Sequence, residues 1–143
     1  MLLDFLFYTM SDGVFKYKEL AFPKSEERNA KIFVWALHLY RRYIEKCLKK
    51  SRRFDAPNNI WNMMDLVDGI IQTGNISGEG WFLTAEMVEL IHSGAPSIAC
   101  VQPFACLPNH VTGKGMIKEL RRRFPGANIS AIDYDPGSSE VNQ

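Results

Sequence analysis

The stretch SIACVQPFACLPNHVTGKGMIKELRRRFPGANISAIDYD, residues 97–135, decides the fold class. It opens with a short apolar run, 97–104, that is typical of a buried strand, and residues 128–135 form a second such run. A loop over 105–113 and a helix over 114–124 separate the two runs. Pro125 and Gly126 follow directly and end the helix. Strand, loop, helix and strand of this length predict a βαβ unit with parallel strands. We therefore expect an α/β fold.

A long helix is expected upstream, over residues 25–53. Ser25 stands where an N-cap belongs, and two acidic residues follow it in the first turn. Apolar side chains recur at three- and four-residue steps and form two neighbouring stripes. The stripes comprise Ile32, Trp35, Ala36, Leu39, Tyr43 and Cys47, and Phe33, Leu37, Tyr40, Ile44 and Leu48. So broad an apolar surface predicts burial on more than one side, with Cys47 in the core.

The remaining segments are also mainly helical by pattern. Helices are expected over 60–71, after an Asn-Asn cap signal, and over 81–94, which Gly94 and Pro96 end. Residues 1–22 fit either a hairpin about a Ser-Asp-Gly turn signal or a short helix, and the pattern leaves both open.

Composition narrows the class of protein. The chain has 143 residues, 46% of them hydrophobic and 23% charged, which indicates a globular protein. A net charge of +1 predicts no attraction to nucleic acid or to membranes. Three cysteines are too few for a disulfide framework and favour a reducing compartment, so a cytoplasmic location is expected.

Two regions are expected within one compact domain. Residues 1–57 would form an N-terminal segment carrying the long helix, and residues 58–143 the α/β part. The last residues, PGSSEVNQ, contain no final element by pattern. We therefore expect the chain to be a fragment of a larger protein.

The loop after the first strand is the expected site, because ligands gather beyond the carboxyl ends of parallel strands. It runs from Gln102 to Gly115 and ends on a helix N-terminus, whose amides favour an anion or a thiolate. Gln102 and Lys114 are the candidate cofactor-binding residues, and Cys106 is the candidate metal ligand. The loop also holds Asn109, His110, Thr112 and Gly113.

Cys106 has three interpretations, which the residues alone leave open. It can be a small buried apolar residue. It can be a thiolate ligand of a metal or an iron–sulfur cluster. It can also be a nucleophile, if His110 serves as its base.

Two further patterns permit weaker interpretations. Residues 112–115, TGKG, lack the first glycine and the trailing hydroxyl of a P-loop, so ATP binding is not expected. A small anion at the helix start, or simple capping, remains open there. Asp133 and Asp135 can hold a cation at the second strand's end, or serve a Pro-Gly turn.

Residues 78–143 resemble the C-terminal part of the activase-related proteins, which are relatives of the 2-hydroxyacyl-CoA dehydratases and benzoyl-CoA reductases. The most specific motif is QPFACLPNH, residues 102–110, similar to the Pro-Phe-x-Cys-x-Pro motif of that family. Gly78-Glu79 upstream and IDYDPG, residues 132–137, support the likeness.

The resemblance implies a Rossmann-like α/β domain and a redox role. In the catalytic relatives, cysteines from several domains hold an iron–sulfur cluster, expected here as 4Fe-4S, and Cys106 matches one of them. An ATP-dependent activator supplies the electron that reduces a CoA thioester. The other cysteines and the activator are absent here, so the fragment alone is expected to be inactive and without a cluster. Expected partners are the remaining domains of the parent, a CoA-thioester substrate and a second copy. A non-catalytic interaction module or a small-anion-binding domain are the alternatives.

Overall fold

The computed structural model describes residues 2–51, 56–103 and 105–134. The chain forms two compact units, Met1–Met63 and Met64–Gln143. Each has buried apolar side chains of its own, such as Phe15 in the first and Leu120 in the second.

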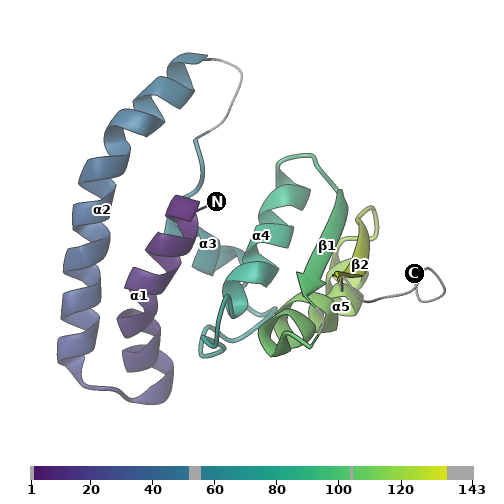
Figure 1. Ribbon diagram of the computed structural model, residues 1–143, viewed down its shortest axis with the longest axis horizontal. Coiled ribbons are helices and arrows are strands. Elements are labelled where there is room, and N and C mark those ends of the chain that lie inside the picture. The colour runs from purple at the N-terminus through teal and green to yellow at the C-terminus, as the bar shows by residue number, and fades with distance from the viewer. Residues whose placement is uncertain (1, 52–55, 104, 135–143) are drawn as a thin grey trace. The chain divides into compact units, whose positions relative to one another are not determined.

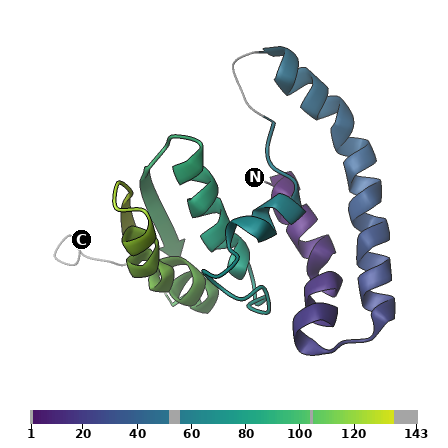
Figure 2. The same ribbon diagram turned by 180° about the vertical axis from the view of Figure 1, so that it is seen from behind.

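The first unit is a helical hairpin. Helix α1 (Leu2–Leu20) and helix α2 (Lys24–Ser51) lie side by side and run in opposite directions (Figure 1; Figure 2 shows them from behind). The helical interpretation of residues 1–22 is confirmed, and the β-hairpin interpretation is wrong.

The Ser-Asp-Gly sequence of α1 serves helix packing instead of a turn. A Cβ on Gly13 would lie 2.6 Å from the carbonyl oxygen of Glu26, so glycine is what lets α2 approach so closely. Ser11 is fully buried, and its hydroxyl donates to the Tyr8 carbonyl at 2.8 Å. A side-chain bond of this kind makes serine acceptable inside a helix.

The link between α1 and α2 is a tight C-terminal cap. Ala21 has a φ of 56°, and the Phe22 amide donates to the Lys16 carbonyl at 3.2 Å. This bond closes the end of α1 over the residue with the positive φ. Helix α2 then starts at Lys24, so Ser25 lies in its first turn and the expected N-cap position is wrong.

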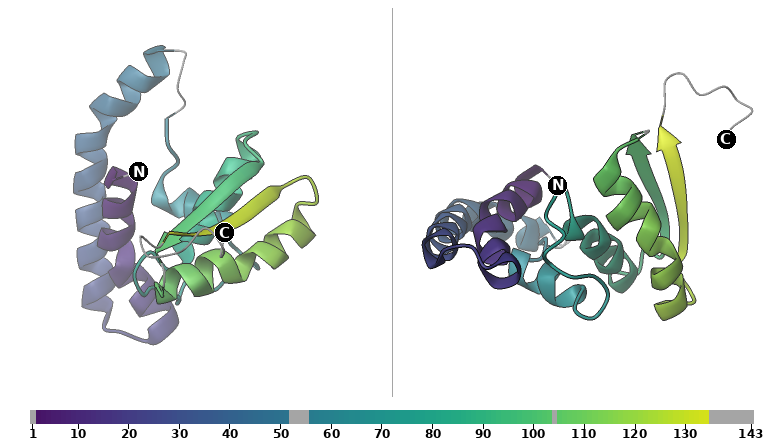
Figure 3. Two further views of the ribbon diagram at one scale, coloured as in Figure 1. Left: turned by 45° about the vertical axis from the view of Figure 1, so that its right-hand side comes forward. Right: turned by 90° about the horizontal axis from the view of Figure 1, so that it is seen from below.

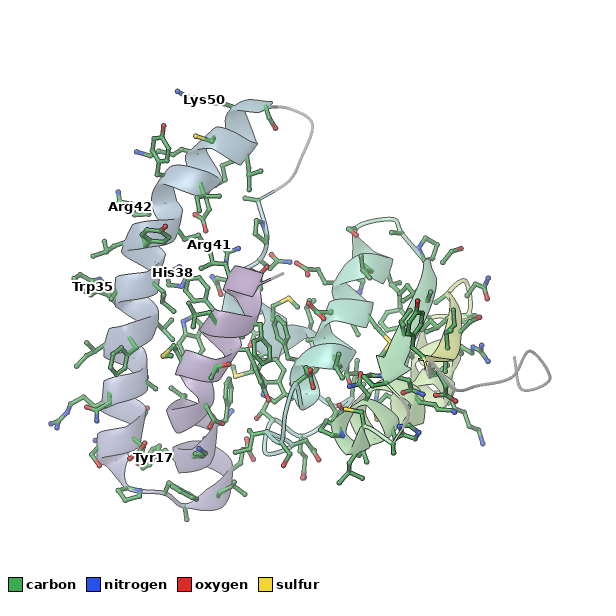
Figure 4. All side chains as sticks on the ribbon, in the orientation of Figure 1. Tyr17, Trp35, His38, Arg41, Arg42 and Lys50 are labelled. Carbon is green, nitrogen blue, oxygen red and sulfur yellow. The ribbon has the colours of Figure 1, made fainter. Side chains whose placement is uncertain are left out.

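Helix α2 buries a narrower stripe than the sequence predicts. Its buried residues are Ala30, Val34 and Arg41, and Figure 4 shows His38 and Arg41 pointing toward α1. Most of the two predicted apolar stripes is exposed, including Cys47, so its expected place in the core is wrong. Within the described part of the first unit, α1 covers one side of α2, whereas periodicity alone predicts an apolar surface and not what covers it.

Helix α3 (Ile60–Leu66) follows the expected cap. The Asn59 Oδ1 accepts a hydrogen bond from the Asn62 amide at 2.9 Å. The helix is shorter than the predicted 60–71 because the chain turns after Leu66, and Gly69 takes a φ of 66°.

The second unit contains the predicted βαβ unit. Strands β1 (Ser97–Pro103) and β2 (Asn128–Tyr134) pair in parallel, with Ser97 opposite Asn128 and Gln102 opposite Asp133. The expected position of both strands and their parallel pairing are confirmed for the described residues.

Helices α4 (Trp81–His92) and α5 (Ile117–Arg123) cover one face of this sheet (Figure 3, right). Their apolar side chains form a core with the inward side chains of the strands. The core consists of Met87, Val88, Ile117, Leu120 and Ile129, with Ile98 and Cys100 packed against it. The protein is thus a mixed helix and strand protein with a two-stranded parallel sheet and flanking helices.

The opposite face of the sheet is exposed among the described residues. Val101, Ile132 and Tyr134 lie there with more than two-fifths of each side chain accessible. Parallel sheets are normally covered on both faces. Within the described ranges, no helix is both long and apolar enough to cross a membrane.

Candidate functional site

The helix after β1 begins earlier than predicted. Residues 107–123, here called the site helix, are helical throughout: a first turn, the π-helical turn η1 (Asn109–Gly113), the 3₁₀ turn η2 (Lys114–Met116) and α5. The Cys106 carbonyl accepts the His110 amide at 3.0 Å, which places Cys106 at the N-terminal end. The predicted loop over 105–113 is therefore wrong for most of its length.

A local signal for this helix start is present in the sequence. Pro108 lies in the first turn, where the missing amide hydrogen of proline is tolerated and its fixed φ is suitable. Ala105 has a φ of 59°, and the Cys106 amide donates to the Pro103 carbonyl at 3.2 Å. The chain turns sharply here, and Cys106 follows immediately.

Cys106 is half-buried, and its sulfur accepts a hydrogen bond. The donor is the Asn109 side-chain amide, with 2.9 Å between Nδ2 and Sγ. Asn109 is itself buried. The sequence analysis did not predict this role for Asn109. In a helix that starts at Cys106, residue 109 lies one turn further on the same side, which brings the two side chains into contact.

His110 contacts the backbone of Cys106 instead of its sulfur. The His110 Nδ1 lies 3.0 Å from the Cys106 carbonyl oxygen. A nucleophilic thiol needs a base within reach of the sulfur. The described geometry gives the nucleophile interpretation no such contact.

A second polar group joins the ends of the two strands. The fully buried Gln102 donates from Nε2 to Asp133 Oδ1 at 2.5 Å. Lys114 Nζ lies 3.1 Å from Asp133 Oδ2. Asp133 thus links β2 to β1 and to the site helix, while Asp135 lies outside the described residues.

These contacts favour the ionised form of Asp133. The hydrogen bond from Gln102 lowers the pKa of the Asp133 carboxyl most, followed by that from Lys114, and the charge of His110 acts in the same direction.

Gln102 also has an open acceptor. Its Oε1 is buried and has no hydrogen-bond partner among the described residues. Buried side-chain oxygens are generally hydrogen-bonded. The strand end therefore retains one position that a donor can fill.

Lys114 does not lie at a helix start. Its amide donates to the carbonyls of Asn109 and His110, so that amide is engaged within the helix. Its ammonium group is engaged with Asp133. The expected helix start at residues 112–115 is therefore wrong, whereas the binding of a small anion there stays a prediction.

Helix α4 and a glycine hold the π-helical turn in place. The Thr84 hydroxyl donates to the Thr112 carbonyl at 2.6 Å, and both residues are buried. A Cβ on Gly113 would lie 3.3 Å from the Cys100 sulfur, so this glycine lets the site helix pack closely on β1. Turns of this kind are frequent at functional sites.

The start of the site helix is braced by the loop before α4. Gly78 has a φ of 59°, and a Cβ there would lie 2.8 Å from Cγ of Pro108. Gly78 is thus required both by its backbone conformation and by close packing. Its contact fixes the turn next to Cys106.

Cys106 is the metal ligand that the sequence analysis predicts. No group of three or more His, Cys, Asp and Glu side chains that could hold a metal is found among the described residues. All three cysteines are free, and burial raises the pKa of the Cys100 thiol on the inner face of β1. Among these three cysteines, Cys106 combines partial exposure with a place at a helix start and a hydrogen bond to its sulfur.

Comparisons with known proteins give no match. No protein-family model, no curated protein and no solved structure matches this chain. The resemblance to the activase-related proteins therefore stays a prediction.

Proposed function

We propose that Cys106 supplies one thiolate ligand to an iron–sulfur cluster of a larger redox protein, similar to the activase-related relatives of the 2-hydroxyacyl-CoA dehydratases. The observation that carries this proposal is the 2.9 Å hydrogen bond from Asn109 to the half-buried Cys106 sulfur. Hydrogen bonds to cysteine sulfurs are among the features that set the potential of such clusters.

The position of Cys106 supports the same role. It precedes the site helix, whose N-terminal amides and dipole favour negative charge. It also follows the carboxyl end of a parallel strand, where ligands of α/β proteins gather. A thiolate here can be reached without unfolding the helix.

The remaining ligands and the chemistry belong to the parent protein in this proposal. A cluster supplies the electron for reduction of a CoA thioester in the catalytic relatives. In this chain, Cys106 holds one corner, and Asn109 orients the sulfur. Gln102 and Lys114 form the polar strand end beside it, where the open Gln102 oxygen can accept a donor group of a bound molecule.

A Rossmann-like arrangement is proposed for the whole domain. The exposed apolar face of β1 and β2 supports it, because further strands and helices of a longer protein would cover that face. Three free cysteines support a reducing, cytoplasmic location.

The test compares iron and sulfide content after anaerobic purification of this chain and of a chain extended upstream. The extended chain should bind iron and sulfide, and Cys106→Ser should remove most of both. Cys47→Ser is the matched control, because Cys47 is exposed on α2 and should leave the content unchanged. Asn109→Leu should keep the iron and shift the reduction potential.

The absence of iron from both folded chains would contradict the ligand role. The second candidate function, a non-catalytic interaction module, would then lead. The exposed apolar surface of α2 favours that alternative.

A further inference from the structure

The outer surface of α2 is more apolar than the stripe that it buries. The stripe facing α1 contains Ala30, Val34 and the charged Arg41. The large side chains lie elsewhere on the helix and remain exposed. They are Ile32, Phe33, Trp35, Leu39, Tyr40, Tyr43 and Ile44, here called the outer face. Tyr40 and Tyr43 are 73% and 76% exposed.

A row of cations borders this outer face. Its members follow one another at three- or four-residue steps, with one step of eleven residues, or about three helical turns, which places them on one side of the helix. The row, here called the basic flank, consists of Lys24, Arg28, Lys31, Arg42, Lys46 and Lys49, all of them exposed. Figure 4 shows Trp35 and Arg42 on the side of α2 away from α1.

Few carboxylates offset this charge. Helix α2 contains three, and two of them are paired: Glu27 with Lys31 at 2.6 Å and Glu45 with Arg41 at 3.0 Å. Glu45 therefore neutralises a buried arginine, whereas Glu27 neutralises Lys31, one of the six members of the flank. The chain's net charge of +1 conceals a strongly cationic helix side.

From these observations we infer that α2 lies in the plane of an anionic phospholipid surface, with its outer face in the interfacial layer. A helix of 28 residues with aromatic and aliphatic side chains on one face and Lys and Arg beside it has the features of an interfacial helix. Trp and Tyr favour the membrane interface. The long basic side chains can reach the headgroups while their stems stay in apolar surroundings.

The tip of the hairpin extends this surface. Tyr17, Leu20 and Phe22 are exposed at the end of α1 and in the turn. Lys16 lies 5.9 Å from the centre of the Phe22 ring. Lys24 begins the basic flank directly after this turn. Apolar side chains and cations therefore alternate from the turn into α2.

Other occupants fit less well. If two copies paired with α2 antiparallel, the two basic flanks would face and repel each other. If they paired in parallel, each flank would face a side of α2 that has no row of carboxylates. A nucleic acid would use the cations and aromatic rings but leave Ile32, Leu39 and Ile44 uncovered. The exposed face of the β-sheet, which suits a protein neighbour, has no such row of cations among the described residues.

The inference does not depend on Cys106, and it replaces the expectation, drawn from net charge, that membranes play no part.

The test is sedimentation of the full chain with vesicles of phosphatidylcholine alone or with added phosphatidylglycerol. Binding should need the anionic lipid and weaken as salt is added. The triple variant Arg42→Gln, Lys46→Gln, Lys49→Gln should bind about 100-fold more weakly, at about a factor of five per cation.

A matched pair of variants tests the apolar part. Tyr40→Ser should weaken binding several-fold, whereas Tyr134→Ser, which removes an equally exposed tyrosine from the second unit, should not. Circular dichroism should show unchanged helix content for all variants, because each substituted side chain is exposed.

Three results would overturn the inference. One is equal sedimentation with both kinds of vesicle, or none with either. Another is a stable dimer in solution that Tyr40→Ser dissociates, which would assign the outer face to a second copy. The third is binding of a single-stranded RNA oligonucleotide, lost in the triple variant, without binding to anionic vesicles.

Discussion

At the scale of single residues, the site consists of two small hydrogen-bonded groups. Asn109 donates to the Cys106 sulfur, and Gln102 and Lys114 hold the Asp133 carboxylate. Cys106 was identified from sequence because its type and position after a strand are both informative. Asn109 and Asp133 acquire their roles from neighbours that only the folded chain brings close.

The first prediction concerns the ionisation of Asp133. Its pKa should lie below its ordinary value of 3.8, because Gln102 and Lys114 stabilise the carboxylate. Lys114→Met should raise this pKa toward 3.8 without fully restoring it, since the Gln102 bond remains. Carbon-detected NMR titration of the carboxyl measures both values.

The same shift gives a pH dependence with a definite sign. The pKa is lower in the folded state than in the unfolded state, so ionised Asp133 stabilises the fold above the unfolded-state value. This stabilisation is lost as the pH falls through the folded-state pKa. Asp133→Asn should therefore flatten the loss of stability on acidification below about pH 4. The prediction would be contradicted if Asp133→Asn lost stability on acidification as steeply as the unsubstituted protein.

At the scale of elements, glycine and alanine positions determine how the segments meet. Gly13 allows α1 and α2 to approach, and Gly113 allows the site helix to approach β1. Ala21 and Ala105 have positive φ values, which residues other than glycine adopt only at a cost in conformational free energy. Both alanines stand at sharp changes of chain direction.

Ala21→Gly should stabilise the first unit by about 0.5–1 kcal/mol, because glycine removes the strain at the end of α1. Ala36→Gly is the control: it lies in the interior of α2 and is exposed, so it should destabilise by about 1 kcal/mol. Urea unfolding of both variants measures the difference. A loss of stability in Ala21→Gly would argue against a strained cap.

Gly78→Ala should destabilise the second unit by about 2–4 kcal/mol, since it combines a positive φ with a clash against Pro108. Gly94 has a φ of 85°, but a methyl group there would meet nothing within 4 Å, so Gly94→Ala should cost only about 1 kcal/mol. Thermal unfolding compares the two. Because Pro108 lies in the first turn of the site helix, Gly78→Ala should also increase the rate at which iodoacetamide alkylates Cys106. An equal loss of stability in Gly78→Ala and Gly94→Ala would contradict the role of Gly78 in positioning Pro108.

At the scale of the whole molecule, the chain forms two units with different internal supports. The second has an apolar core between its helices and sheet. The first relies in addition on a buried ionic centre. Arg41 is 1% exposed, pairs with Asp4 and Glu45, and donates to the Pro57 carbonyl at 2.7 Å.

Arg41→Ala should destabilise the first unit by about 3–5 kcal/mol, because it breaks a buried ion pair and leaves its partners unbalanced. Arg42→Ala, one residue on and exposed, should change stability by no more than about 0.5 kcal/mol. Native-state hydrogen exchange should show the loss in α1 and α2 amides, with α4 and α5 little affected. An equal loss in both units would show that they unfold as one.

The sequence by itself determined a mixture of helix and strand, both strands with their parallel pairing, and most of the helices. It could do so because strand runs, caps and breaking residues act locally. It also placed Cys106 at the end of a strand. The start of the site helix at Leu107 was not predicted, although Pro108 is a local signal for a first helical turn.

Tertiary structure alone decided which surfaces are buried and which groups meet. Periodicity shows that α2 is apolar over a broad arc, but only the position of α1 selects the stripe that is covered. The Ser-Asp-Gly sequence in α1 fits a turn by its pattern, yet in the structure it is helical and Gly13 packs closely against α2. Likewise, Gln102 and Asp133 are far apart in the chain and become neighbours only through strand register, because parallel pairing is a non-local interaction.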